Sequence, residues 1–141
     1  MRVLALDYGS ARCGCALSDP TGTIVTPIDT VLRPATKRGF ASLRELVRER
    51  DVERVVVGLP LSLDGSDTEQ TRETRAFASE LAMRLGADVP VEMHDERFTT
   101  RLAQRSDLPK QPRKAGSTFA TSEDSRAAAH LLESWLAAQA R

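Results

Sequence analysis

The chain has 141 residues, which is typical of one domain, so we expect a single domain over residues 1–141 and no second lobe of a kinase. Hydrophobic residues make up 40% and charged residues 28% of the sequence, which excludes a disordered chain. Twenty basic residues balance twenty acidic ones, so any affinity for nucleic acid must come from a local basic surface. No apolar run is as long as a membrane span, and Asp7 comes too early for a signal-peptide core. We therefore expect a cytoplasmic protein.

The first predicted elements are strands around a turn. Residues 3–6 are apolar throughout, as in a strand covered on both faces, and a second strand is predicted at 13–17. This second strand contains both cysteines of the chain, which we interpret as small buried side chains because their spacing suits neither a disulfide nor zinc. A third strand is predicted within residues 23–31. An amphipathic spacing of apolar residues then predicts a helix over residues 36–50.

A central strand and a long helix are predicted next. Residues 55–57 form a β-branched run, and Gly58 and the proline after it are typical of a turn that ends a strand. Ser66 and Glu69 have the spacing of a capping box, and apolar residues at helical spacing follow as far as a glycine. We therefore expect a helix over residues 66–86.

The last elements complete a mixed α/β pattern. A strand is predicted at 89–93, and a final helix at 123–140. Between them, residues 107–122 contain prolines, a glycine and hydroxyl side chains with little apolar periodicity, which predicts a mobile loop. The order of elements indicates an α/β fold in which an antiparallel edge joins a partly parallel sheet.

Acidic residues stand at the ends of three predicted elements. Asp7 ends the first strand, the neighbours Asp95 and Glu96 follow the strand at 89–93, and Asp124 opens the final helix. The carboxyl ends of parallel strands share one crevice, so the first two groups are expected to meet there. An acid at the start of a helix is also a common cap. However, the apolar stripe that includes Ala128 and Trp135 has the same helical phase as Asp124, which turns this acid toward the sheet.

Three carboxylates that converge in one crevice need a cation, because their mutual repulsion would otherwise raise their pKa values. Hard oxygen ligands select Mg²⁺ or Mn²⁺, and such ions assist phosphodiester cleavage. This pattern fits a metal-dependent nuclease, but it does not select that class by itself, because scattered acids occur in every protein.

Four motifs occur in one order over nearly the whole chain. They are Leu6-Asp7-Tyr8-Gly9-Ser10 with Gly14 and Ser18-Asp19, Gly58-Leu59-Pro60 with Asp64-Gly65-Ser66, Asp95-Glu96-Arg97-Phe98-Thr99-Thr100, and Asp124-Ser125-Arg126-Ala127-Ala128. This combination resembles the YqgF/RuvX family of pre-16S rRNA nucleases, also called Holliday junction resolvases. The resemblance implies a ribonuclease H-like fold, with a five-stranded mixed sheet flanked by helices.

The resemblance also implies hydrolysis of nucleic-acid phosphodiesters with Mg²⁺ or Mn²⁺ as cofactor, and it supplies a role for each acid. Asp7 would be the central catalytic metal ligand, Glu96 the second and Asp124 the third. Asp95 is the alternative to Glu96, because adjacent residues at a strand end point to opposite sides. In the expected mechanism a metal-activated water attacks the phosphate and leaves a 5′-phosphate and a 3′-hydroxyl.

A local basic segment follows the paired acids, with six basic residues and one acid from 97 to 114. Arg97 and Arg101 lie one helical turn apart beside the expected metal site, where they could hold phosphates, and Arg12 follows the turn after Asp7. For Arg12 a salt bridge with Asp7 is the alternative. The candidate nucleic-acid-binding residues are Arg12, Arg97, Arg101, Lys110, Arg113 and Lys114.

The expected function is 5′-end processing of pre-16S rRNA, with resolution of branched DNA in recombination and repair as the alternative. A two-fold symmetric homodimer would favour the resolvase, because it matches the symmetry of a junction. Two other classes compete. One is a nucleotide-binding module, since an Asp-x-Gly-Ser turn also opens the sugar-kinase fold, and the other is a nuclease-like scaffold that binds nucleic acid without catalysis.

Overall fold

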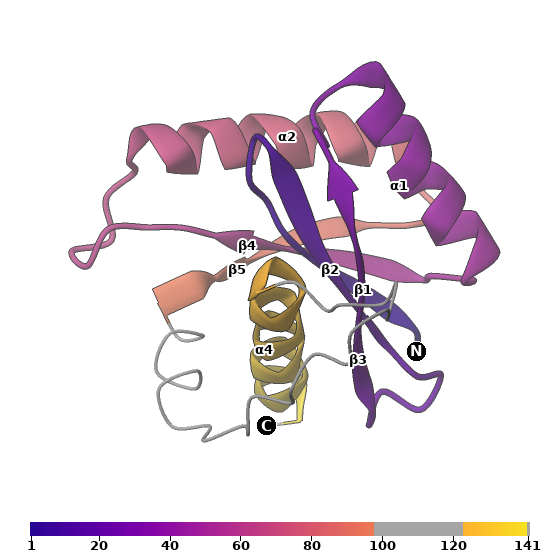
Figure 1. The fold of residues 1–141 in the computed structure, drawn as a ribbon. Helices are drawn as coiled ribbons and strands as arrows, with labels where there is room; N and C mark the ends of the chain where they lie inside the picture. The colour runs from indigo at the N-terminus through magenta and orange to yellow at the C-terminus, as the bar shows by residue number, and fades with distance from the viewer. Residues whose placement is uncertain (98–122, 141) are drawn as a thin grey trace, which may run out of the picture.

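The computed structural model describes residues 1–97 and 123–140 (Figure 1). Five strands and three helices lie wholly within these residues, and Glu96 and Arg97 are helical as well. In chain order they are β1 (Val3–Asp7), β2 (Arg12–Ser18), β3 (Val25–Leu32), α1 (Lys37–Glu49), β4 (Arg54–Leu59), α2 (Glu69–Leu85), β5 (Val91–Asp95) and α4 (Glu123–Gln139). Among these helices, none is long and apolar enough to cross a membrane.

The five strands form one mixed sheet in the order β3-β2-β1-β4-β5. β1 pairs with β4 and β4 with β5 in parallel, while β2 pairs antiparallel with both β1 and β3. This confirms the predicted five-stranded sheet with an antiparallel edge. The register brings the ends of β1, β4 and β5 and the start of β2 to the same end of the sheet. That end, called the acidic end below, is where the candidate acids were expected.

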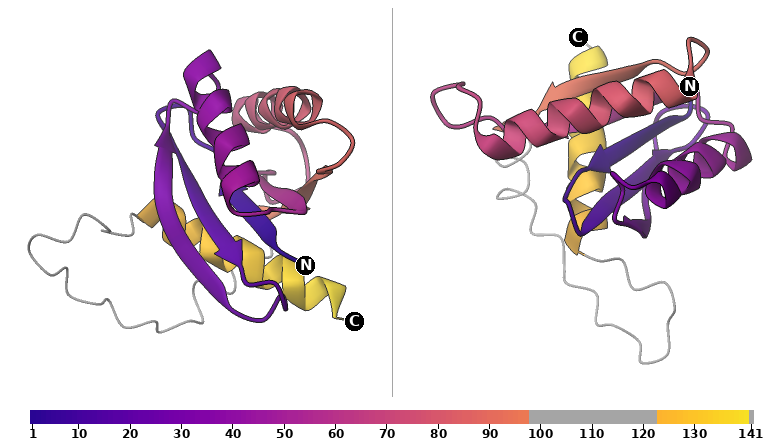
Figure 2. Two further views of the ribbon diagram at one scale, coloured as in Figure 1. Left: turned by 90° about the vertical axis from the view of Figure 1, so that its right-hand side faces the viewer. Right: turned by 90° about the horizontal axis from the view of Figure 1, so that it is seen from above.

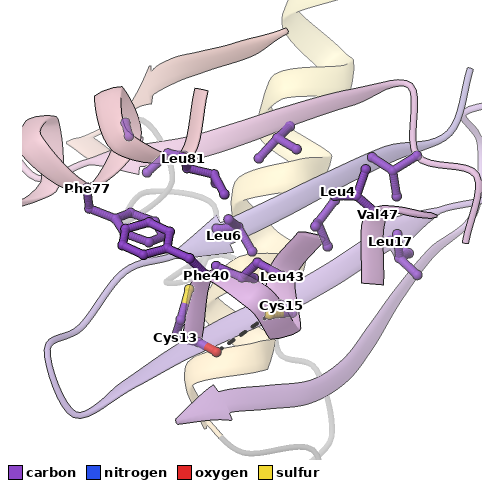
Figure 3. Close-up of a cluster of buried hydrophobic side chains, with 14 residues drawn as sticks. Leu4, Leu6, Cys13, Cys15, Leu17, Phe40, Leu43, Val47, Phe77 and Leu81 are labelled. Carbon is purple, nitrogen blue, oxygen red and sulfur yellow. Dashed lines mark hydrogen bonds between the residues drawn. The ribbon is translucent and has the colours of Figure 1, made fainter. Parts of the chain in front are cut away.

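Helices cover both faces of the sheet. The views in Figure 2 show α1 and α2 on one face and α4 on the other. The larger core lies under α1 and α2, where Phe40, Leu43, Phe77 and Leu81 pack on side chains of β1, β2 and β4 (Figure 3). A smaller core lies under α4 and includes Trp135. The central strands are therefore buried on both faces, as their continuous apolar runs predicted.

The strand β2 alternates between these two cores. Cys13 and Cys15 are fully buried in the larger core, which confirms that they are small buried side chains without a disulfide. Ala16 belongs to the smaller core, and Gly14 faces the start of α4. The alternation follows from the period of two in a strand.

Several predicted element boundaries were wrong. The strand predicted at 89–93 is β5 at Val91–Asp95, so Asp95 is its last residue. Ser66 does not cap α2, because its backbone N–H and hydroxyl both donate to Asp64 within the preceding loop. Thr68 caps the helix instead, in a reciprocal capping box with Thr71. Gly58 is part of β4 rather than of a turn, since the strand continues to Leu59. Tertiary pairing with β5 extends the strand through this glycine.

Candidate active site

Two predicted acids are in contact at the acidic end of the sheet. Asp7 is the last residue of β1, and Glu96 directly follows β5. Although β4 lies between these strands, the two side chains share a hydrogen bond. Glu96 reaches across β4 at Gly58, where a Cβ would lie only 2.4 Å from its Oε1 atom. A glycine in β4 thus leaves room for the glutamate beside Asp7.

Burial and proximity alter the acidity of this pair. Burial raises the pKa of Asp7, and the negative charge of Asp124 raises it further, while the hydrogen bond with Glu96 acts in the opposite direction. Burial, the hydrogen bond to Asp7 and the charge of Asp7 raise the pKa of Glu96 to about 8. At neutral pH a protonated Glu96 therefore donates to an ionised Asp7, and the two carboxyl groups hold one negative charge.

The third acid, Asp124, lies in the first turn of α4. Its place depends on close backbone packing, because a Cβ on Gly14 would lie 1.9 Å from the carbonyl oxygen of Asp124. Ser125 fixes the same turn: its buried hydroxyl donates to the carbonyl of Ile28 at 2.6 Å and accepts from the N–H of Cys15 at 3.4 Å. The start of α4 is thereby attached to β2 and β3, with the Asp124 carboxylate half-exposed and close enough to influence Asp7.

Arg12, one of the candidate phosphate-binding residues, lies beside Asp124. Its Nε atom is 3.9 Å from the Oδ2 atom of Asp124, and its side chain is 58% exposed. The ion pair is thus formed with Asp124, and not with Asp7 as the sequence alternative had it. An exposed guanidinium beside this carboxylate can also reach a phosphate in solvent.

Arg97 makes different contacts from those expected of a phosphate-binding residue. Its Nη2 atom lies 2.6 Å from Oδ2 of Asp95, and its Nε atom also donates to this carboxylate. Asp95 is thus paired with Arg97, and the hydrogen bonds and charge of this arginine lower its pKa. Of the two neighbouring acids, Glu96 is the one that contacts Asp7.

The donor chemistry of the site fits a hard divalent cation. Asp7 and Glu96 are carboxyl groups in contact, and Asp124 is their neighbour. A bound cation would lower the raised pKa values of both groups and so favour their ionised forms. Within residues 1–97 and 123–140, no three acidic, histidine or cysteine side chains already surround a common point as metal ligands. Mg²⁺ needs few protein ligands, because water and phosphate oxygens complete its coordination.

The remaining predicted residues, Arg101, Lys110, Arg113 and Lys114, lie outside the described residues, as does the loop expected at 107–122. His94, next to the acids in β5, has its Nε2 atom 3.0 Å from the hydroxyl of Ser134. Ser125, Gly14 and Gly58 were missed as site residues. The sequence showed only that each is a small residue inside a strand or a motif. Such a residue does not indicate which distant side chain or backbone group packs against it.

Comparison with known proteins identifies the family. The sequence model of RuvX, described as Holliday junction resolvase, matches residues 1–138. The chain belongs to the RuvX family. A relative from Maridesulfovibrio salexigens, named "Putative pre-16S rRNA nuclease", is 38% identical over 137 residues, which cover 97% of this chain and 98% of the relative. A relative of the same name from Mycobacteroides abscessus is 42% identical over 139 residues, covering 96% of this chain and 80% of the relative.

Solved structures confirm the fold of this RuvX chain. Thermus thermophilus RuvC in complex with a Holliday junction substrate superposes with a TM-score of 0.61 at 16% identity, covering 99% of this chain and 96% of RuvC. The fowlpox virus resolvase gives a TM-score of 0.59 at 11% identity over the whole of both chains. The predicted ribonuclease H-like fold, the predicted family and the predicted nuclease class are thus confirmed for this RuvX protein.

Proposed function

We propose that this RuvX chain is a divalent-metal-dependent nuclease that hydrolyses phosphodiester bonds in 5′-end processing of pre-16S rRNA. The observation that carries the proposal is the buried contact between Asp7 and Glu96, with Asp124 beside it at the acidic end of the sheet. The names of the curated relatives support rRNA as the substrate. The balanced overall charge is consistent with a substrate contact that is confined to the acidic end of the sheet.

Asp7, Glu96 and Asp124 would hold Mg²⁺ or Mn²⁺. When bound, the ion would act as a Lewis acid that makes water a better nucleophile and stabilises the leaving oxygen. The ionised Asp7 supplies negative charge at the centre of the site, and Glu96 would have to give up its proton to solvent in order to act as a ligand. Arg12, exposed beside Asp124, is placed to bind a phosphate of the substrate strand.

Resolution of Holliday junctions is the second candidate, and the description of the matching family favours it. Junction cleavage needs two strands to be cut symmetrically, which a two-fold dimer with paired sites provides. A monomer that cuts only single-stranded or precursor RNA would favour the ribosomal substrate.

The proposal is tested with purified wild type and Asp7→Asn. Each is incubated with labelled single-stranded RNA, precursor rRNA ends and a four-way DNA junction, in Mg²⁺, Mn²⁺ or EDTA. We expect Asp7→Asn to fold and to bind RNA like the wild type, since it removes a charge with little change in shape. Its cleavage rate should fall by more than about 100-fold, beyond the loss typical of residues that only support a metal ligand.

Cleavage that requires both the metal and Asp7 would support the nuclease, and the substrate that is cut fastest would choose between the two candidates. Cleavage by Asp7→Asn at the wild-type rate would show that the site is wrongly assigned. If wild type binds these nucleic acids but cuts none of them, the chain is a binding scaffold.

A further inference from the structure

Glu96 and Arg97 are helical residues directly after β5, and contacts of Asp95 and Arg97 fix this first turn on both sides of Glu96. The backbone N–H of Arg97 donates to the Oδ1 atom of Asp95 at 2.9 Å, so the aspartate side chain spans the peptide units on both sides of Glu96. The guanidinium of Arg97 then holds this carboxylate from the other side, with Nε 2.9 Å and Nη2 2.6 Å from Oδ2. Both oxygens of Asp95 are thereby engaged by a single residue.

The same guanidinium reaches the loop between β4 and α2, whose tip extends beyond the end of β4 (Figure 1). The Nη1 atom of Arg97 donates to the carbonyl of Leu63 at 3.3 Å. Gly65, with φ at +88°, lies under the guanidinium, and a Cβ there would be 3.4 Å from Nη1. The end of β5 and this loop are thus connected through one side chain.

The loop is itself ordered by internal hydrogen bonds. Asp64 accepts hydrogen bonds from the backbone N–H and the hydroxyl of Ser66, and the N–H of Gly65 donates to the carbonyl of Ser62 at 2.9 Å. The N–H of Ser62 donates in turn to the carbonyl of Ser66 at 3.1 Å. An ordered loop gives Arg97 a fixed point of attachment, because local closure limits how far the Leu63 carbonyl can move.

We propose that Asp95 and Arg97 are positioning residues for Glu96. They fix the backbone turn that carries Glu96 and attach it to the loop after β4, while Gly58 leaves room for the carboxylate on the sheet. The inference rests on the proposed function, in which Glu96 is a metal ligand. It gives Asp95 a role other than metal binding and gives Arg97 a role other than direct phosphate binding.

The chemistry of arginine explains why this position requires it. A planar guanidinium offers donors in several directions, and here they bridge a carboxylate and a backbone carbonyl at once. Lysine keeps the charge but is a single point of contact on a flexible stem, so it cannot hold both groups in one geometry. A direct phosphate contact depends mainly on the charge, and lysine would largely preserve it.

The test therefore compares Arg97→Lys, Asp95→Asn and their double variant with wild type. Arg84→Lys is the matched control, because Arg84 forms a 2.9 Å ion pair with Glu80 on the far part of α2. Three readouts need no cleavage: amide hydrogen exchange of residues 61–67, the carboxyl ¹³C shift of Glu96 in metal-free protein, and Mn²⁺ affinity. The fourth is kcat and KM on the substrate that wild type cuts fastest.

We expect Arg97→Lys and Asp95→Asn each to shift the Glu96 resonance and to accelerate exchange of the loop by about tenfold. Each variant should weaken Mn²⁺ binding by about 10–100-fold, as support residues of a metal ligand do. A loss mainly in kcat, with KM nearly unchanged, would indicate misplacement of Glu96 rather than lost substrate binding. The double variant should be no worse than either single one, since all three break the same connection.

Wild-type exchange, an unchanged Glu96 resonance and full activity in Arg97→Lys would overturn the proposal. A lower salt dependence of RNA binding in Arg97→Ala, with an undisturbed loop, would instead assign Arg97 to phosphate binding. If the resonance and exchange change as expected but wild type neither binds Mn²⁺ nor cleaves, the positioning role stands and the proposed nuclease function fails.

Discussion

Glu96 shares a hydrogen bond with Asp7 across the width of an intervening strand, over a glycine of β4. The contact is an acid pair that holds one proton at neutral pH, because two buried carboxylates in contact cannot both ionise without a counter-charge. A divalent cation and this proton thus compete for the same pair of carboxyl groups.

The first prediction concerns the pH dependence of stability in metal-free protein. The pKa of Glu96 is about 8 in the folded chain against an ordinary value of 4.5, so between these values the folded state holds a proton that the unfolded state has lost. Stability in EDTA should therefore fall as the pH rises from about 5 to 8. Saturating Mg²⁺ should raise the melting temperature more at the upper end of this range, because fewer protons then compete with the ion for the carboxyl groups.

Thermal unfolding across this range, in EDTA and in Mg²⁺, measures both effects. Glu96→Gln is the control, because it removes the titrating group and should flatten the decline in EDTA. A melting temperature in EDTA that rises from about pH 5 to 8 in wild type and Glu96→Gln alike would contradict the shared proton.

The second prediction separates two glycines of the site. In Gly58→Ala the new methyl group meets the end of the Glu96 side chain, which can swing away, so we expect a stability loss below about 1 kcal/mol with a large loss of cleavage. In Gly14→Ala it meets the backbone of Asp124, and the first turn of α4 must move. We expect a loss of about 1–3 kcal/mol there, together with loss of cleavage. Urea unfolding and cleavage assays on both variants provide the comparison, and equal stability losses would count against it.

The third prediction is that Ser125→Ala destabilises the chain by about 1–3 kcal/mol, because it leaves buried backbone groups of Ile28 and Cys15 without their partner. Chemical denaturation measures the loss. Ser42→Ala, an exposed change on α1, is the matched control and should stay within about 0.5 kcal/mol of wild type. A similar effect of both substitutions would mean that Ser125 does not anchor α4.

The fourth prediction concerns Arg12. If its exposed guanidinium binds a substrate phosphate, Arg12→Ala should weaken RNA binding and lower the slope of log affinity against log salt by about 0.7. Binding titrations at several salt concentrations give this slope. Arg48→Ala, at the end of α1 remote from the acids, removes the same charge and should leave the slope unchanged. Equal slopes for wild type and Arg12→Ala would place the substrate strand elsewhere.

The sequence by itself determined the sheet and the positions of its acids along the chain. Apolar runs and periodicity are local properties, and they marked β1, β2 and α4 to within a residue or two. The ordered motifs also identified the family and the nuclease class, which the comparisons confirm. Asp7 and Asp124 were selected because each lies at the end of an element, where the topology of an α/β sheet gathers residues.

Only the tertiary structure decided which neighbours meet. Whether Asp95 or Glu96 contacts Asp7 depends on the exact turn after β5, and a shift of one residue reverses the side that each faces. Arg97 could not be assigned to Asp95 from spacing, because its contacts join the strand end to the Leu63 carbonyl in a loop distant in sequence. Gly14 likewise has a partner only when α4 packs on β2. Local patterns set which elements form, whereas pairing between distant elements sets which atoms touch.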